Sequence, residues 1–327
     1  MEVINSKECK VDVQICTELY YSKKSVITRI EGFIARHTEI QPILNIAIQD
    51  VHTWATSFDG YASKRSRLDI LLNDNDIDDL VLRALVSVVE LDNRSDLLVS
   101  ISSKVAASIK GMTKLDAVKT AGEILVIMCD ADLINLEQDT NQYTKNGQLH
   151  DTTSWYVVSP WQLDETTSKH IARAMYLPPM IVQPQKIKAN NHSGYLTKGK
   201  ESVILGSENH HDGEQNLANI NRFNSVELSL NIDMLKFVTE ELLNDEEKRK
   251  AINSSAKRRE QYDNLMRQSY HVFAYLVKND NKFFLTHSYD MRGRTYSGGY
   301  HCNTQGDAFR KSIVEFAKKE KVTGNFD

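Results

Sequence analysis

Apolar residues between residues 42 and 160 recur at the three- and four-residue spacing of amphipathic helices. The clearest face carries apolar side chains at Ile77, Leu80, Val81, Ala84, Leu85 and Val88. Two further faces follow the same spacing, one at Leu115, Val118, Gly122, Leu125 and Met128, the other at Leu228, Ile232, Leu235 and Leu242. Residues 141–153 are polar and predict a loop. The pattern as a whole predicts a mainly α-helical fold.

Prolines divide the chain into two parts. Four of the five prolines fall in one short window, at Pro160, Pro178, Pro179 and Pro184. Because proline removes a backbone donor and interrupts helices, we expect helices on either side of this window. Residues 283–300 are rich in aromatic residues and glycine, which predicts a small β element in the second part.

Charge is distributed unevenly, although the net charge of the whole chain is only −4. Residues 248–321 contain 16 Lys or Arg and seven Asp or Glu, a net charge of +9, which leaves −13 for the rest of the chain. A helix-prone basic run covers residues 248–267. Such a run forms either a nucleic-acid-binding face or a solvated helix face, and the sequence leaves both open.

Cysteine usage and hydropathy indicate the compartment. The four cysteines, Cys9, Cys16, Cys129 and Cys302, include no C-x-x-C pair, which argues against a zinc ribbon or a disulfide framework and is typical of a reducing environment. No stretch approaches the roughly 18 uncharged apolar residues of a membrane span, and the first residues lack the apolar core of a signal peptide. We therefore expect a cytoplasmic protein with no membrane partner.

A glycine-rich segment near the C-terminus carries the strongest candidate chemistry. Four of the 14 glycines lie between Gly293 and Gly306, and Arg292 and Arg294 flank the first of them. Glycine lets the backbone approach a partner closely, and forked guanidinium groups fit phosphate oxygens or a carboxylate. Asp290 is placed to orient one arginine. The segment is therefore either a phosphate site or a structural Arg–Asp pair in a turn, and its basic surroundings favour phosphate.

Two other groups of residues suggest structural roles. His210, His211 and Asp212 are adjacent in sequence but lack the spacing of a known metal site, so we expect a surface loop. The three tryptophans have apolar neighbours, which predicts core anchors at Trp54, Trp155 and Trp161.

Residues 289–296, YDMRGRTY, are followed by Asn303, Gln305, Gly306 and Lys311 in NTQGDAFRKSIVEFAK. This run resembles the D-x-x-G-R motif region of the single-subunit, bacteriophage-type RNA polymerases, a family that includes the mitochondrial enzymes. Residues 177–196 are similar to the family's proline-rich segment, and residues 216–238 to the helix after it. The resemblance covers residues 78–327. It departs from the family at residues 183–186, where QPQK has one proline and no tryptophan.

The resemblance implies a helical N-terminal domain over residues 1–176 and the beginning of a right-hand polymerase domain over residues 177–327. The D-x-x-G-R segment of the second domain would contact the template strand and the RNA:DNA hybrid. The implied nucleic-acid contacts are Asp290, Arg292, Gly293, Arg294, Tyr296, Asn303, Gln305 and Lys311. Arginines beside a glycine neutralise phosphates without reading the base sequence, as sliding along a template requires. We expect Tyr296 to be a core aromatic with a bonded hydroxyl. Lys311 is expected to open an apolar helix, whose Ile313, Val314 and Phe316 need a covering surface.

The family's metal-binding aspartates and its H-D-S motif would follow Lys311, and the sequence ends at Asp327. Nucleotidyl transfer needs two metal ions held by carboxylates. The resemblance therefore implies the smaller, N-terminal subunit of a heterodimeric DNA-directed RNA polymerase, with no catalytic or metal-binding residue of its own. A partner chain would carry the palm and fingers motifs, Mg²⁺ and the ribonucleoside triphosphates. The alternatives are a truncation and a non-catalytic relic of the fold that binds nucleic acid or regulates a host protein. The expected location is the cytoplasm of an infected bacterial host.

Overall fold

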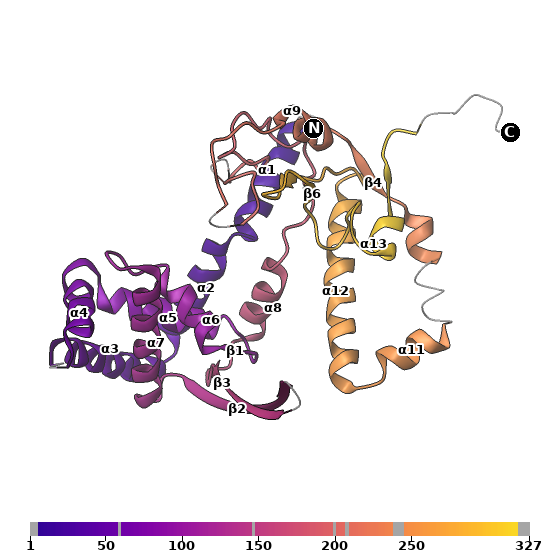
Figure 1. Cartoon of the computed structure of the whole chain (residues 1–327). Coiled ribbons are helices and arrows are strands. Elements are labelled where there is room, and N and C mark those ends of the chain that lie inside the picture. The colour runs from indigo at the N-terminus through magenta and orange to yellow at the C-terminus, as the bar shows by residue number, and fades with distance from the viewer. Residues whose placement is uncertain are drawn as a thin grey trace. The chain divides into compact units, whose positions relative to one another are not determined.

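The computed structural model of the chain describes residues 6–57, 60–145, 148–198, 201–206, 209–237 and 245–319. Helices make up about 54% of the chain, which confirms the mainly α fold that the hydrophobic pattern predicts. The chain forms two compact units (Figure 1). A helical unit comprises residues 23–172, and a discontinuous unit combines residues 1–22 with residues 173–327. None of the described helices has the length and apolar character needed to cross a membrane.

The helical unit is built from α2 (Lys23–Arg36), α3 (Ile40–Ser57), α4 (Ala62–Asp74), α5 (Ile77–Val89), α6 (Leu98–Ala106), α7 (Lys114–Asp130) and most of α8 (Glu165–Ala174). Helix α5 buries all six apolar positions that define its predicted face. It begins where the side chain of Asp76 accepts a hydrogen bond from the Asp79 amide at 3.1 Å. Leu125 and Met128 of α7 are fully buried, whereas Leu115 in its first turn is exposed.

The polar loop predicted over residues 141–153 is wrong. Strands β2 (Asn135–Lys145) and β3 (Gln148–Val158) pair there as a long antiparallel ribbon, with Lys145 opposite Gln148, and β1 (Ser95–Leu97) adds to the other edge of β3. The sequence contains an Asn-Gly pair between the two long strands, a dipeptide that favours two-residue hairpin loops. Polarity misled the prediction because strands of a ribbon pair through their backbones and do not require an alternating apolar face.

The discontinuous unit contains α1 (Ser6–Tyr20), α9 (Leu217–Asn224), α11 (Glu246–Ile252), α12 (Ala256–Lys278), α13 (Ala308–Ser312) and four short strands. The strands are β4 (Leu228–Leu230), β5 (His287–Tyr289), β6 (Thr295–Ser297) and β7 (Val314–Phe316); β4 pairs with β7 and β5 with β6. The strand and loop system predicted over residues 283–300 is confirmed by β5 and β6.

The helix predicted over residues 228–242 is only partly correct. Leu228 begins strand β4, and a helical segment follows at residues 232–237, while Leu242 lies outside the described residues. The helix expected over residues 216–238 is broken in the same place, since α9 ends at Asn224. Leu228 and Leu230 hydrogen-bond through their backbones to the segment that carries Phe283 and Asn281, so pairing overrides the helical spacing.

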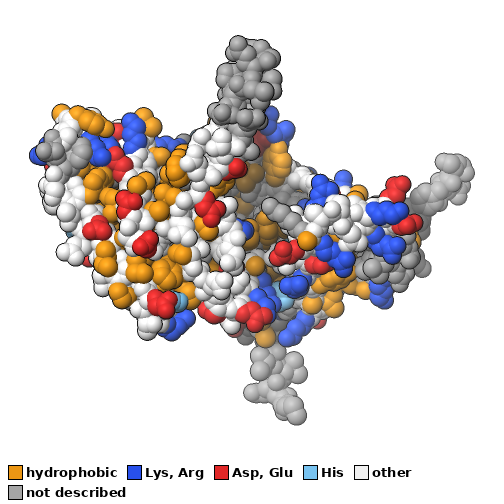
Figure 2. Space-filling view, turned by 90° about the horizontal axis from the view of Figure 1, so that it is seen from below, with side chains coloured by type: hydrophobic (Ala, Val, Ile, Leu, Met, Phe, Trp, Pro, Cys, Tyr) orange, Lys and Arg blue, Asp and Glu red, His pale blue; other side chains and the backbone are white. Residues whose placement is uncertain are grey.

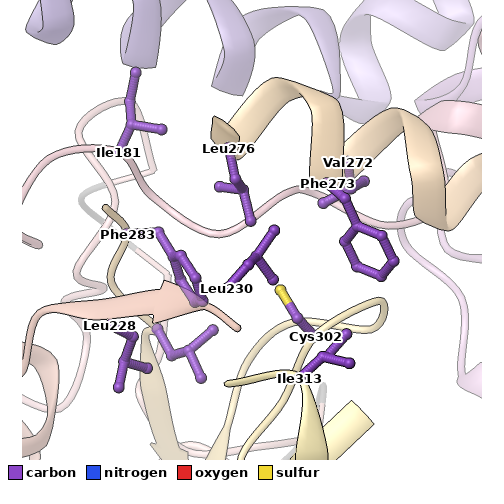
Figure 3. Close-up of a cluster of buried hydrophobic side chains, with 10 residues drawn as sticks. Ile181, Leu228, Leu230, Val272, Phe273, Leu276, Phe283, Cys302 and Ile313 are labelled. Carbon is purple, nitrogen blue, oxygen red and sulfur yellow. The ribbon is translucent and has the colours of Figure 1, made fainter. Parts of the chain in front are cut away.

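The main core of the discontinuous unit lies beside α12 (Figure 3). It gathers buried side chains from α12, β4, the proline-rich segment, the segments on either side of the β5–β6 hairpin and the residue before β7, namely Ile181, Leu228, Leu230, Val272, Phe273, Leu276, Phe283, Leu285, Cys302 and Ile313. Burial raises the pKa of Cys302 to about 12, so its thiol stays protonated and serves as a small apolar side chain.

Helix α1 is joined to this unit by a buried carboxylate. Glu18 and Gln14 are fully buried, and the Gln14 amide donates to Glu18 at 2.9 Å. Glu18 also accepts hydrogen bonds from the Leu196 amide at 3.1 Å and from the amide and hydroxyl of Thr197, both at 2.7 Å. Gln14 in turn accepts from the Ile181 amide at 2.9 Å. One turn of α1 therefore holds both ends of the proline-rich segment.

We predict that Glu18→Gln lowers the free energy of unfolding of the discontinuous unit by roughly 1–3 kcal/mol, because an amide NH₂ would face donors that now bind the carboxylate. Chemical denaturation of the full chain measures this change. Asp12→Asn, the same change at an exposed position of α1, is the matched control. Equal stability of the two variants would contradict the role of Glu18.

Candidate nucleic-acid interface

The D-x-x-G-R segment is the turn of the β5–β6 hairpin, and both outer edges of this hairpin are occupied. On the edge of β5 that faces away from β6, Tyr289 exchanges backbone hydrogen bonds with residues 203–205. Its amide donates to the Val203 carbonyl at 2.9 Å, and its carbonyl accepts from the Leu205 amide at 2.7 Å. The Tyr289 ring is buried, and its hydroxyl donates to the Asn216 carbonyl at 2.7 Å. The hairpin is thereby fixed to the body of its unit.

Gln305 covers the open edge of β6. Its side chain accepts from the Ser297 amide at 2.8 Å and donates to the Thr295 carbonyl at 3.0 Å, as a neighbouring strand would. Asn303 supports the same loop by donating to the carbonyls of Ser297 at 3.1 Å and Gly299 at 2.8 Å. The structure therefore gives Asn303 and Gln305 local backbone partners, and the nucleic-acid contacts implied for them stay a prediction.

Asp290 organises the turn between the two strands. Its Oδ1 accepts the amides of Arg292 and Arg294, both at 2.9 Å. Its Oδ2 accepts Nε of Arg294 at 2.8 Å, with the Arg294 Nη2 at 2.7 Å and the Arg292 Nε at 3.5 Å. The structural Arg–Asp pair that the sequence allows is thus formed.

Gly293 supplies the backbone conformation that the turn requires. Its φ is +77°, a left-handed value that residues with a Cβ rarely adopt, and its amide donates to the Asp290 carbonyl at 2.9 Å. No heavy atom lies within 4 Å of the position that a Cβ would occupy. The glycine is therefore needed for its φ and leaves open space at the tip of the turn.

The turn lowers the pKa of Asp290 from 3.8 to about 2, chiefly through the amide hydrogen bond from Arg294 and further through its side chain and the Arg292 amide. The ionised carboxylate is therefore the form that fits the turn. In the pair, the pKa of Arg294 is raised, first by its hydrogen bond to Asp290.

Two arginines project from this turn toward solvent. The side chain of Arg292 is 74% exposed and that of Arg294 is 54% exposed, whereas Asp290 is only 17% exposed. Arg294 lies over the ring of Tyr296 at 5.6 Å from its centroid, and the Tyr296 hydroxyl lies 3.4 Å from Asp290. Tyr296 itself is exposed, so the expected bonded hydroxyl is present but the expected core position is wrong. Strand β6 turns this ring outward, beside the arginines.

Lys311 does not open an apolar helix. It lies exposed in the last turn of α13, and the residues after Ile313 form strand β7. Ile313 is fully buried in the core of its own chain, so it needs no further cover, whereas Phe316 is exposed. The prediction failed because residues 314–316 pair with β4 as a strand, and pairing between segments this distant in the sequence leaves no signal in the helical spacing.

An aromatic stack that the sequence did not indicate lies beside this segment. The rings of Tyr176 and Tyr300 stack with centroids 3.7 Å apart, and the guanidinium of Arg310 lies 4.3 Å from the Tyr300 centroid. His301, edge-on to both rings, is buried and bonded to Ser269 at 2.9 Å. Burial, with the nearby charge of Arg310, lowers its pKa to about 4, so His301 is neutral near pH 7.

Basic side chains also gather over α11 and the first turns of α12 (Figure 2). Exposed cations there include Arg249, Lys250, Arg258 and Arg259. Lys250 pairs with Glu246 at 3.1 Å and Arg259 with Asp263 at 3.4 Å, both one helical turn apart. Exposed pairs of this kind contribute little to stability, so the helices present a solvated basic face, which is compatible with either alternative for this run.

The remaining candidates lie outside this interface. His210 and Asp212 are exposed on a loop and 3.4 Å apart, which confirms the expected surface loop. Trp161 is partly buried and donates to the Leu133 carbonyl at 2.8 Å, but Trp155 is exposed on β3, so its expected core role is wrong. Among described residues, no group of three or more His, Cys, Asp or Glu side chains could hold a metal ion.

A cavity of about 620 Å³ opens in the helical unit between α3, α4, α6 and α7. Trp54, Arg67 and Glu123 line it, and no residue predicted from the sequence to contact nucleic acid does. Arg67 is held there by Thr120 at 2.6 Å and by Glu123 at 3.3 Å.

Comparison with known proteins gave no match, either to a protein-family model or to a curated protein.

We predict that Asp290 stays ionised at pH 3.5, where an ordinary Asp carboxyl is more than half protonated. Because the folded-state pKa is lowered, the hydrogen bonds of the turn are complete above pH 4 and are lost as the pH falls toward 2. NMR of the Asp290 carboxyl and of the Arg292 and Arg294 amides follows this titration, and Asp290→Asn gives the reference for amides without the carboxylate. A carboxyl midpoint near 3.8 would contradict the turn.

Proposed function

We propose that this chain is the smaller, N-terminal subunit of a heterodimeric DNA-directed RNA polymerase and that it holds the template strand and the RNA:DNA hybrid. The observation that supports this most is the Asp290 turn, in which a single carboxylate fixes the backbone and leaves two arginines exposed. The residues that form it are the ones that resemble the D-x-x-G-R motif.

The turn suits a contact that does not depend on base sequence. Guanidinium groups bind phosphate oxygens through charge-assisted hydrogen bonds, and such contacts position a protein on nucleic acid without reading its bases. Asp290 orients Arg294 by taking its Nε, which preorganises the guanidinium plane before a phosphate arrives. The open space at Gly293 lets a phosphate approach the backbone. In the proposed role, Arg292 and Arg294 are the primary contacts.

Further positive charge lies on the same unit. Exposed cations on α11 and the first turns of α12 add to the positive charge of this unit, and positive charge on a protein attracts a polyanion before contacts form. Catalysis would come from the partner chain, whose carboxylates would bind Mg²⁺ and whose fingers would bind the ribonucleoside triphosphates.

Templated synthesis tests this proposal. The full chain is assayed alone and after co-expression with the product of a neighbouring reading frame that carries D-x-x-x-G-I-Q, K-x-x-x-Y-G and H-D-S motifs. We expect no RNA from the chain alone, and template- and Mg²⁺-dependent RNA from the pair. RNA synthesis by the chain alone would contradict the proposal that catalysis depends on a partner chain. A pair that binds hybrid but makes no RNA would indicate the non-catalytic relic instead.

A further inference from the structure

Strand β7 is the outermost member of a backbone ladder assembled from four distant segments. Met180 and Phe284 exchange hydrogen bonds of 3.0 and 2.7 Å, and Phe283 and Leu228 exchange bonds of 2.8 and 2.9 Å. Leu228 begins β4, which pairs on its other edge with β7. The ladder therefore runs from Met180 through residues 283–284 and β4 to β7.

The outer edge of β7 carries unpaired backbone groups. The Asn231 amide donates to the Ile313 carbonyl at 2.9 Å, and the Ala317 amide donates to the Glu227 carbonyl at 3.1 Å. The backbone N–H and C=O groups of the odd-numbered residues 313–317 therefore point toward β4. In an antiparallel pair the residues between them point the opposite way. The N–H and C=O groups of Val314 and Phe316 therefore point outward, and within the described part of the chain they make no backbone hydrogen bond.

The side chains at this edge differ from those deeper in the ladder. Val314 packs against the buried cluster that contains Ile313 and Leu230, whereas Phe316 is 67% exposed. A large exposed aromatic next to open donors and acceptors is a template for strand addition.

Charge indicates which kind of strand fits. Residues 307–319 contain four cations, Arg310, Lys311, Lys318 and Lys319, and two carboxylates. Asp307 lies 3.8 Å from Arg310 and Glu315 lies 3.3 Å from Lys319, so the segment keeps a net charge of +2. A second copy of this chain pairing antiparallel would bring Lys311 of one copy toward Lys318 and Lys319 of the other, and like charges across a strand pair are unfavourable. A strand that carries carboxylates beside an apolar residue is complementary.

We propose that the outer edge of β7 accepts an extended strand of the catalytic partner chain, with an apolar side chain against Phe316 and carboxylates toward the flanking cations. This inference rests on the proposed function, because the partner is the one assumed there. It specifies how the two chains join: through backbone hydrogen bonds to Val314 and Phe316.

Amide hydrogen exchange on the free chain and on the co-purified complex tests the proposal. We expect the Val314 and Phe316 amides to exchange quickly in the free chain and to slow by about 100-fold or more in the complex. The Glu315 amide, which faces β4, should be protected in both. A complex that leaves Val314 and Phe316 unprotected overturns strand addition while leaving the heterodimer intact, whereas failure to form any complex overturns both proposals.

Phe316→Pro provides an independent arm, because it removes an outward donor and leaves the bonds to β4 in place. We expect affinity for the partner to fall by about tenfold or more, with melting of the free chain unchanged. Phe316→Ala, which keeps the amide, should weaken assembly less, and Phe237→Ala, at another exposed Phe of the unit, should not change it. Slow exchange of the Val314 and Phe316 amides in the free chain would show that the chain covers this edge itself. Self-association that Phe316→Pro abolishes would show that a second copy covers it, and either result would overturn the proposal.

Discussion

Every buried backbone amide and carbonyl needs a hydrogen-bond partner, and in the discontinuous unit side chains supply many of those partners because long stretches there are neither helix nor strand. Glu18 takes the amides at the end of the proline-rich segment. Asn281 binds both the amide and the carbonyl of Leu230, and Gln305 does the same for the edge of β6. Removing one such side chain therefore leaves backbone amides or carbonyls without a hydrogen-bond partner, in addition to removing the packing contacts of the side chain.

The same constraint explains why some polar side chains of the D-x-x-G-R segment bind backbone groups while others stay exposed. Asp290, Asn303 and Gln305 bind mainly backbone of their own loop and hairpin. Arg292 and Arg294 are left with their guanidinium groups at the surface, one of them oriented by the carboxylate below it. Asp290 thus positions the backbone of both arginines and the side chain of Arg294, while Asn303 and Gln305 hold strand β6 and the loop after it.

Sequence patterns located the elements whose signal is local. The apolar face of α5 is continuous, and the helix begins after the capping residue Asp76, so it was predictable. The β2–β3 ribbon was missed although its Asn-Gly pair favours a hairpin, because the polar composition of its strands indicated a loop. Strand β4 was missed because its pairing depends on residues distant in sequence. The turn at Gly293 was found from its composition, but the stack of Tyr176 on Tyr300 was not, since 124 positions separate the two residues and neither has a local signal.

The central claim is that Arg292 and Arg294 bind backbone phosphates, and the salt dependence of binding tests it most directly. Binding of the full chain to a labelled RNA:DNA hybrid with a single-stranded template overhang is measured against salt for wild type and for the Arg292→Ala, Arg294→Ala double variant. The slope of log affinity against log salt should flatten by about 2, one counterion for each lost contact. Arg83→Ala, an exposed arginine also paired one turn away with an aspartate, should bind as wild type, and all three proteins should melt alike. An unchanged slope, or weaker binding accompanied by a lower melting temperature, would contradict the account.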